Sequence, residues 1–573
     1  MLSSQERSLL QEPGRDSLER NLQHIASHNR LSGSSGERKA VEYLASELEE
    51  KEIPFEIQEH RVRLSNPLRA RLLCTLRGKA SFEIPAKAWS FTHSGGLLQS
   101  RGEACFLDSR ELPSTFPEYL LERKKYPRDL EGKIILGTSG MPFQIRSLQD
   151  RGAAGYILCW SQGEEEEIHE GNINMVWGTP LPEDLELFLE MPVVAVNHLR
   201  GKELIRLAEE GSLEAAMEVE LQDLVTSVPL LEATLSAPSG NLDYLLIGNH
   251  LDSWHYGACD NATGNALCLE LARKLKEIQP LLKRGVRIAW WSGHSNGRYA
   301  GSSSYAGRNY GNLLEHCLAY MNVDMPGLRG ARDYSTLTAG PDLFELGREA
   351  LEDITGYRGN PAPHIRGWDQ SFQNLGISPY FIWGSALSPG HPDSTGNSFM
   401  SWWWHTEKDL PEYCDLEVLQ KDLSLYLLGA FRFLTAPGES LYQPEKLFDS
   451  ILERLSLLER KIGKSCDLAP LREHLHAASR SFRERKGKGD LSWNLQKQVL
   501  RKLNQIYYAE KASSLQDYAI PEDYIPGLST AASLVAKPSE EHEELYTLRY
   551  LETRKNRLHS LGWELRFLCS EKA

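Results

Sequence analysis

Residues 244–272 read YLLIGNHLDSWHYGACDNATGNALCLELA. The stretch begins as an apolar run of strand length, passes through a polar turn that contains glycine, and continues into apolar residues at helical spacing. Similar apolar runs recur in RIAWWSG, CLAYMNVD and SPYFIWGS, with helix-like segments between them. Strands that alternate with helices predict an α/β fold around a mostly parallel or mixed sheet.

Polar residues follow these predicted strands. His250 ends the first strand, Asp260 lies at the start of the next helix, and Asp324 ends the strand CLAYMNVD. Because ligands bind beyond the carboxyl ends of strands in such sheets, we expect these side chains to lie together. Imidazole and carboxylate groups suit zinc-like divalent ions, and His405 in WWWHTEKD adds a second imidazole. Taken alone, Asp260 fits a helix cap equally well.

The composition excludes some functions. The chain has 573 residues and a formal net charge of −15, so no basic excess is present to bind a nucleic-acid backbone. No stretch approaches the roughly 20 apolar residues that span a bilayer, and the first residues lack the pattern of a secretory signal. Nine cysteines without C-x-x-C pairs indicate a reducing compartment. We therefore expect a cytoplasmic protein with neither nucleic acid nor membrane as its partner.

The pattern of predicted strands and helices changes twice along the chain. The short strands GKIILG (132–137) and GAAGYILCW (152–160), with a helical segment between them, indicate a small α/β domain inserted at 95–225. From about residue 440 the chain becomes helical, with Leu447, Ile451, Leu455 and Leu458 on one face. The predicted units are 1–94, 95–225, 226–438 and 439–573, of which the first and third form one domain.

Several ordered motifs carry a resemblance. The motifs H-x-D-S-W, G-A-x-D-N-A-T-G, N-V-D, W-D-Q-S-F and H-T-x-x-D resemble those of the co-catalytic zinc aminopeptidase and carboxypeptidase family. The most similar branch is that of glutamate carboxypeptidase II and the transferrin receptor. The resemblance implies a zinc-exopeptidase-like core, a protease-associated insert at 95–225, and a helical dimerisation domain at 439–573. It therefore also implies a homodimer.

The resemblance implies roles for the polar residues. His250 and Asp324 would hold one metal ion, Asp260 would bridge, and His405 would hold a second ion. Asp252, in the H-x-D motif, would act at the catalytic site by orienting the ring of His250. The cofactor implied is a divalent metal of the zinc type, as one or two ions.

The chain departs from the family at one motif. Where the family has W-x-G-E-E-x-G-x-x-G-S, with a catalytic glutamate and a ligand glutamate, this chain has WSGHSNGRYAGS (291–302). Aligned on Gly297, His294 replaces the base and Ser295 replaces the ligand; aligned on Gly301, Ser295 and Asn296 do. A site without these carboxylates should hold a second cation less well.

His294 itself has two possible roles. It is a candidate metal ligand, the alternative we favour from the sequence, and also a candidate catalytic base, because its ordinary pKa lies near neutrality. Three reserve carboxylates could also reach the metal: Asp252, Asp393 and Glu407.

The expected function is hydrolysis of a peptide or amide bond in a small substrate through a metal-activated water. Arg298, Trp404 and Asp369 are the expected substrate-binding residues, with Arg298 suited to clamp a carboxylate and Trp404 to wall an apolar pocket. The alternatives are a metal-assisted lyase or cyclase on the same scaffold and a non-catalytic binding protein.

A serine hydrolase is a further alternative. GHSNG fits G-x-S-x-G, and Ser295, then Asp369 or Asp393, then His405 have the triad order of α/β-hydrolases. RYAGSSSYAGRNYG is a poor helix former, however, whereas a nucleophile elbow needs a helix directly after its serine.

Overall fold

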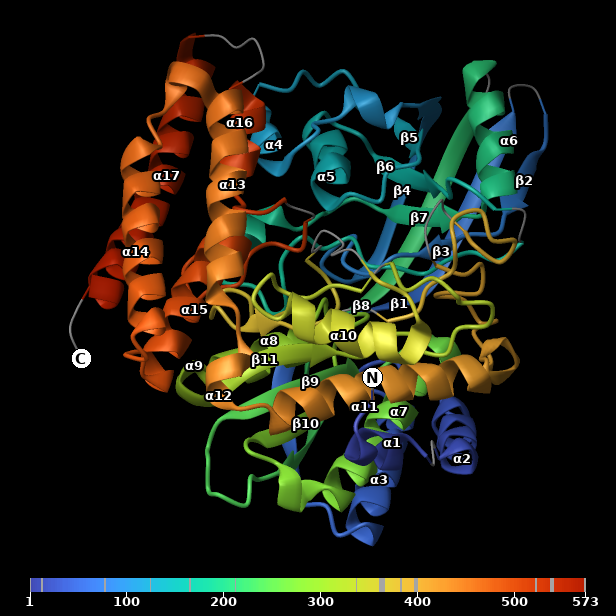
Figure 1. Cartoon of the computed structure of the whole chain (residues 1–573). Helices are drawn as coiled ribbons and strands as arrows, with labels where there is room; N and C mark the ends of the chain where they lie inside the picture. The colour runs from blue at the N-terminus through green and yellow to red at the C-terminus, as the bar shows by residue number, and fades with distance from the viewer. Residues whose placement is uncertain are drawn as a thin grey trace.

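A twelve-stranded sheet forms the framework of the protein and runs through two lobes in the computed structural model (Figure 1). The structure describes residues 2–11, 14–76, 79–123, 125–163, 166–211, 213–335, 337–359, 366–381, 384–395, 400–520, 523–535 and 541–570. The strands are β1 (Phe55–Leu76), β2 (Ser81–Ile84), β3 (Lys87–Ala88), β4 (Gly96–Phe106), β5 (Ile134–Gly137), β6 (Gly155–Cys159), β7 (Val193–Val196), β8 (Leu213–Leu235), β9 (Tyr244–His250), β10 (Gly285–Trp291), β11 (Cys317–Asn322) and β12 (Ser378–Pro379). Their order is β12-β11-β9-β10-β8-β4-β5-β6-β7-β3, and β1 pairs with β8 and β2.

The strands β12, β11, β9 and β10 are neighbours and parallel. Alternate residues of β9 enter different apolar clusters: Leu245 and Ile247 join one, and Tyr244 and Leu246 join the other. A parallel strand that is buried on both faces reads as a continuous apolar run, which explains the sequence YLLIG. The predicted α/β class with a mixed, mostly parallel sheet is confirmed.

Helices cover both faces of this core (Figure 1). The core helices are α1 (Ser4–Leu10), α2 (Arg15–Ala26), α3 (Ser35–Glu50), α7 (Thr263–Glu277), α8 (Ala300–Arg308), α9 (Tyr310–His316), α10 (Phe344–Thr355) and α11 (Leu416–Thr435). The prediction that RYAGSSSYAGRNYG (298–311) would be a poor helix former was wrong, because α8 lies within it and α9 begins at its end. Burial outweighs weak propensity there, since Tyr305 and Ala306 of α8 pack in one cluster with Trp291.

The strands β1 and β8 form a long antiparallel ribbon that joins the core to the second lobe. That lobe contains β4–β7 with α4 (Phe116–Glu122), α5 (Pro142–Asp150) and α6 (His198–Glu209). The strands expected in GKIILG and GAAGYILCW are β5 and β6. The domain boundaries stay a prediction; residue 225 lies inside the continuous strand β8.

The last part of the chain is helical, as predicted. Its helices are α12 (Gly438–Leu441), α13 (Pro444–Ile462), α14 (Ala469–Gly487), α15 (Trp493–Tyr508), α16 (Leu528–Val535) and α17 (Glu541–Ser570). The four apolar residues expected on one face of α13 are all buried. Among the described helices, none is both long and apolar enough to cross a membrane.

Candidate metal centre

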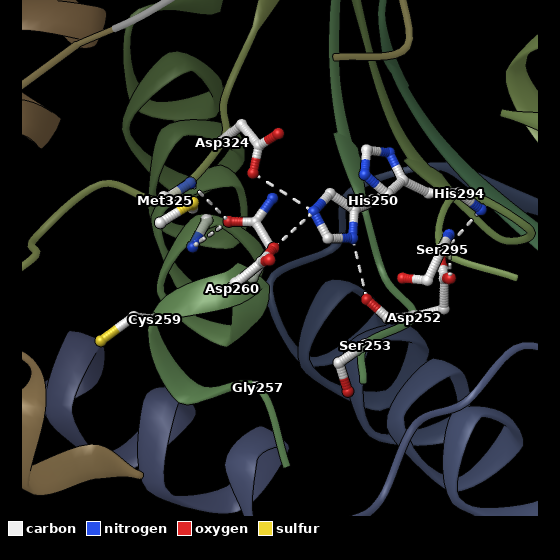
Figure 2. A network of polar contacts seen from close by, with 12 residues as sticks. His250, Asp252, Ser253, Gly257, Cys259, Asp260, His294, Ser295, Asp324 and Met325 are labelled. Atoms are coloured by element: carbon white, nitrogen blue, oxygen red, sulfur yellow. Dashed lines mark hydrogen bonds and ion pairs between the residues drawn. The ribbon is translucent and has the colours of Figure 1, made fainter. Parts of the chain in front are cut away.

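Four of the sequence-predicted ligands meet at the carboxyl ends of the parallel strands. Figure 2 shows three of them, His250, Asp260 and Asp324. His250 is the last residue of β9, and Asp324 follows β11, the neighbour of β9. Asp260 lies in the irregular turn η3 (Ala258–Ala262) ahead of α7, and His405 comes from the loop before α11. Residues separated by up to 155 positions are thus brought to one edge of the sheet, as their positions at strand ends predict.

Asp260 lies between the two imidazoles. Its Oδ1 is 3.0 Å from Nε2 of His250, and its Oδ2 is 3.1 Å from Nε2 of His405. Oδ1 of Asp324 lies 3.2 Å from the same Nε2 of His250. One carboxylate therefore serves two clusters of donor atoms, which is the arrangement expected of a bridging ligand.

Backbone carbonyls fix the tautomer of both imidazoles. Nδ1 of His250 donates to the carbonyl oxygen of Asp252 at 2.8 Å, and Nδ1 of His405 donates to that of Glu170 at 2.8 Å. Because a carbonyl oxygen can only accept, each Nδ1 carries its proton and each Nε2 presents a lone pair to the carboxylates. Lone pairs and carboxylate oxygens this close repel each other unless a proton or a metal ion lies between them.

The donor set therefore fits a zinc-like ion. Donor atoms of a tetrahedral zinc site lie about 3.3 Å apart, close to the separations of His250, Asp260 and Asp324. Without a metal, protons take the cation's place. Burial alone lowers the pKa of His250, but Asp324 and Asp260 outweigh it and hold that pKa well above its usual range. Burial likewise raises the pKa of Asp260, but hydrogen bonds from His250 and His405 outweigh burial and hold that pKa well below its usual range.

The turn that carries Asp260 is held from two sides. The carboxylate of Asp409 accepts hydrogen bonds from the backbone N–H of Cys259 at 2.8 Å and of Asp260 at 2.9 Å. The Asn261 side chain donates to the carbonyl of Val323 at 3.0 Å and accepts from the N–H of Met325 at 3.1 Å, which ties the turn to the segment carrying Asp324. The motif D-N-A-T-G and the last residue of H-T-x-x-D thus fix the bridging carboxylate.

Asp252 acts on its surroundings through two different groups. Its backbone carbonyl orients His250, as described above, whereas its buried carboxylate accepts from the N–H groups of His294 at 3.2 Å and Ser295 at 2.9 Å. The hydroxyl of Ser32 donates to the same carboxylate at 2.6 Å. The predicted orienting role is therefore exercised by the main chain, and the side chain anchors the loop GHSNG.

His294 lies directly on His250. The two rings have centroids 3.8 Å apart and planes inclined by 10°, and Nδ1 of His294 lies 2.6 Å from Oδ2 of Asp369. A nitrogen of His294 comes within 4.8 Å of the donor atoms of His250 and Asp324. Yet an ion in the plane of one ring lies well outside the plane of a ring stacked parallel to it, and imidazole lone pairs lie in the ring plane. The ligand role that the sequence favoured for His294 stays a prediction; the stacking is an argument for the alternative, proton transfer by His294.

The expected substrate-binding residues have varied surroundings. Asp369 accepts from His294 through one oxygen and from the hydroxyl of Ser302 at 2.6 Å through the other, an arrangement that orients His294; its expected contact with substrate stays a prediction. Trp404 stacks on the ring of His405, with centroids 3.6 Å apart. Arg298 donates from Nη2 to the carbonyl of Ala519 at 3.2 Å, while its buried Nε has no hydrogen-bond partner among the described residues.

Two of the three reserve carboxylates, Glu407 and Asp393, lie in ion pairs. Glu407 is 2.6 Å from Nζ of Lys87, in a group with Glu170 and His255, and Asp393 is 3.3 Å from Nη2 of Arg329. The ammonium of Lys87 pairs with both Glu170 and Glu407 and offsets part of their negative charge. Within the described part of the chain, the Ser295 hydroxyl makes no hydrogen bond to a histidine, so the geometry gives no support to a serine triad.

Three contributors to the centre were missed by reading the sequence: Arg30, Ser32 and Glu170. Arg30 is fully buried and donates to five backbone carbonyls, among them those of Leu251, Tyr256 and Gly257, which follow His250 along the chain. A lone arginine after a polar turn carries no sequence signal for this role. Asp409 could have been identified from the sequence, since it belongs to the motif H-T-x-x-D.

Comparisons with known proteins agree with this geometry. Residues 233–427 match the profile of peptidase family M28. The "Probable glutamate carboxypeptidase LAMP1" of Arabidopsis thaliana is 31% identical over 117 residues, which make up 19% of this chain and only 16% of the plant protein. The aminopeptidase YwaD of Bacillus subtilis (strain 168) is 23% identical over 412 residues, 68% of this chain and 78% of that protein.

The fold is also similar to solved structures. The aminopeptidase from Aneurinibacillus sp. strain AM-1 superimposes with a TM-score of 0.55 at 19% identity, and the match covers 75% of this chain and 96% of that one. The protein therefore has a core of the M28 peptidase fold, whose metal-site segment matches the family profile.

Proposed function

We propose that the protein is a metal-dependent hydrolase that cleaves a peptide or amide bond in a small substrate. The observation that carries the proposal is the position of Asp260, whose two oxygens lie 3.0 and 3.1 Å from Nε2 of His250 and of His405. Two imidazoles with their Nε2 atoms aimed at one buried carboxylate need a proton or a metal ion between them, and the match of residues 233–427 to peptidase family M28 supports a metal ion and hydrolysis.

The residues that would hold metal form two unequal sets. His250, Asp324 and Asp260 supply three donors to the first set, as a catalytic zinc site does, whereas Asp260 and His405 supply two to the second. Ser295 stands where one alignment with the family motif puts a glutamate ligand. We therefore expect one tightly held ion and a second that binds weakly. A bound zinc ion would polarise the substrate carbonyl and acidify a water molecule.

The proton is handled by His294. Because Nδ1 donates to Asp369, Nε2 is the nitrogen that accepts a proton from the attacking water and later gives it to the leaving nitrogen. The buried carboxylate of Asp369 stabilises the imidazolium formed in between, and Ser302 holds that carboxylate in place. A histidine–aspartate pair thus replaces the glutamate base of the family motif.

A panel of dipeptides, aminoacyl amides and N-acylated amino acids, assayed with and without a chelator, tests the proposal. We expect turnover of at least one class, lost on chelation, restored by zinc and abolished in Asp260→Asn. Asp393→Asn, which changes a carboxylate paired with Arg329, is the matched control and should retain activity. Activity that resists chelation but is blocked by a fluorophosphonate would overturn the proposal in favour of Ser295.

A further inference from the structure

Two cysteines face each other behind the bridging carboxylate. The sulfur atoms of Cys259 and Cys414 lie 3.4 Å apart although the residues are 155 positions apart in the sequence. All nine cysteines belong to the described part of the chain, and there no other pair has its sulfur atoms in contact. The approach of these two thiols is therefore a specific feature of the fold.

Both thiols belong to the structure that positions Asp260. Cys259 directly precedes Asp260 in η3, and Cys414 follows the short helix η5 (Pro411–Tyr413), five residues after Asp409. The Cys259 thiol also contacts the carbonyl oxygen of Tyr413 at 3.4 Å. Cys259 is buried, whereas Cys414 is partly exposed, so a small oxidant reaches Cys414 first.

We propose that Cys259 and Cys414 form a reversible disulfide when the protein meets a peroxide. The Cys414 sulfur attacks one peroxide oxygen and becomes a sulfenic acid, while the other oxygen leaves as water with the thiol proton. The Cys259 sulfur then attacks the sulfenic sulfur, the S–S bond forms, and the hydroxyl leaves as a second water with the proton of Cys259. Two thiols lose two electrons in total, and one peroxide gains them.

The disulfide restrains the turn that carries Asp260 and does not disrupt it. A disulfide bond is about 2.05 Å long, so the two sulfur atoms need to approach by only about 1.3 Å. The surrounding side chains are apolar, with Leu328, Trp403 and Val418 in the same cluster, and can follow this movement. The hydrogen bonds from Cys259 and Asp260 to Asp409 stay in place. The bond closes a long loop and so restricts the unfolded chain.

The test treats the full chain with hydrogen peroxide or with dithiothreitol. Free thiols are counted after denaturation, and digested peptides are analysed by mass spectrometry. We expect the thiol count to fall by two, a peptide that links Cys259 to Cys414, recovery with dithiothreitol, and a melting temperature higher by about 3 °C in the oxidised protein. Cys414→Ser should show neither the link nor the shift. Cys466→Ser, which removes another partly exposed thiol, should show both.

The opposite results would overturn the proposal: Cys414 oxidised to sulfinic acid with Cys259 still free, or an equal shift of the melting temperature in Cys414→Ser. A further expectation, slower loss of zinc to a chelator after oxidation, rests on the proposed function. The thiol count and the linked peptide do not depend on metal, so failure of the disulfide and failure of the metal centre are distinguishable.

Discussion

At the scale of single residues, the proposed proton transfer depends on His294. Its ring lies parallel to that of His250, and its Nδ1 is engaged by Asp369. A metal ligand needs its lone pair aimed at the ion, which the stacked arrangement does not provide, whereas a base needs only a free nitrogen near the attacking water. We therefore propose that this histidine serves as the base where the related peptidase motif has a glutamate.

Replacing His294 should separate catalysis from metal binding. We expect His294→Ala to lower kcat by about 10²- to 10⁴-fold with little change in zinc content, because only the proton acceptor is lost. Asp369→Asn should also lower kcat, since an amide does not stabilise an imidazolium as a carboxylate does. Steady-state kinetics on the substrate found for the wild type measure both. Wild-type kcat in His294→Ala would contradict the assignment.

Asp342 gives a stability effect far from the metal centre. Burial raises its pKa to about 6 and outweighs the hydrogen bond that Ser378 donates to one of its oxygens. The folded protein thus binds this proton more tightly than the unfolded chain does. The stabilisation is complete below about pH 4 and is lost as the pH rises towards about 6. Relative to Asp342→Asn, the wild type should lose up to about 3 kcal/mol of unfolding free energy over this range, measured by urea denaturation. A difference that does not vary with pH would exclude this cause.

At the scale of elements, the segment between β9 and η3 depends on one side chain. The guanidinium of Arg30 reaches carbonyls at the end of α2 and in residues 251–257. Loss of these hydrogen bonds leaves several buried carbonyls without donors, at about 1 kcal/mol or more each. Arg30→Met should therefore lower the unfolding free energy by about 3 kcal/mol or more and weaken zinc binding, as followed by denaturation and competition with a chelator. Arg38→Met, which removes an exposed pair with Glu59, should cost less than about 1 kcal/mol. Equal effects of the two changes would contradict the role of Arg30.

Most elements could be predicted because their patterns are local. The apolar run of β9 and the apolar face of α13 follow directly from burial, and both were found where the sequence predicted them. Helix α8 could not be predicted, because its stability comes from packing against Trp291 rather than from its serine-rich sequence. The ligands could be placed since they follow strands. The pairing of His294 with Asp369 and the use of Arg30 could not, because they depend on contacts between segments distant in the sequence.

At the scale of the whole molecule, the helical region and the core share one apolar cluster. Leu22 of α2, Leu271 of α7, Leu428 of α11 and Leu503 of α15 belong to it. In addition, Trp493 and Lys497 of α15 donate to Asp243 at 2.6 and 2.8 Å, just before β9. We therefore expect the helical region and the core to unfold in one transition, as checked by calorimetry together with hydrogen exchange. Exchange of the amides in α13–α15 well before those of β9–β11 would contradict this expectation. The homodimer implied by the resemblance stays a prediction.

We propose that His250, Asp260, Asp324 and His405 form a metal centre in which Asp260 bridges and His294 does not bind the ion. Metal content per chain, measured by plasma mass spectrometry on protein purified without chelators or nickel resin, is the decisive test. We expect one tightly held equivalent in the wild type and in His294→Ala, and a large loss in Asp260→Asn. No metal after reconstitution with zinc, or a loss in His294→Ala as large as that in Asp260→Asn, would contradict it.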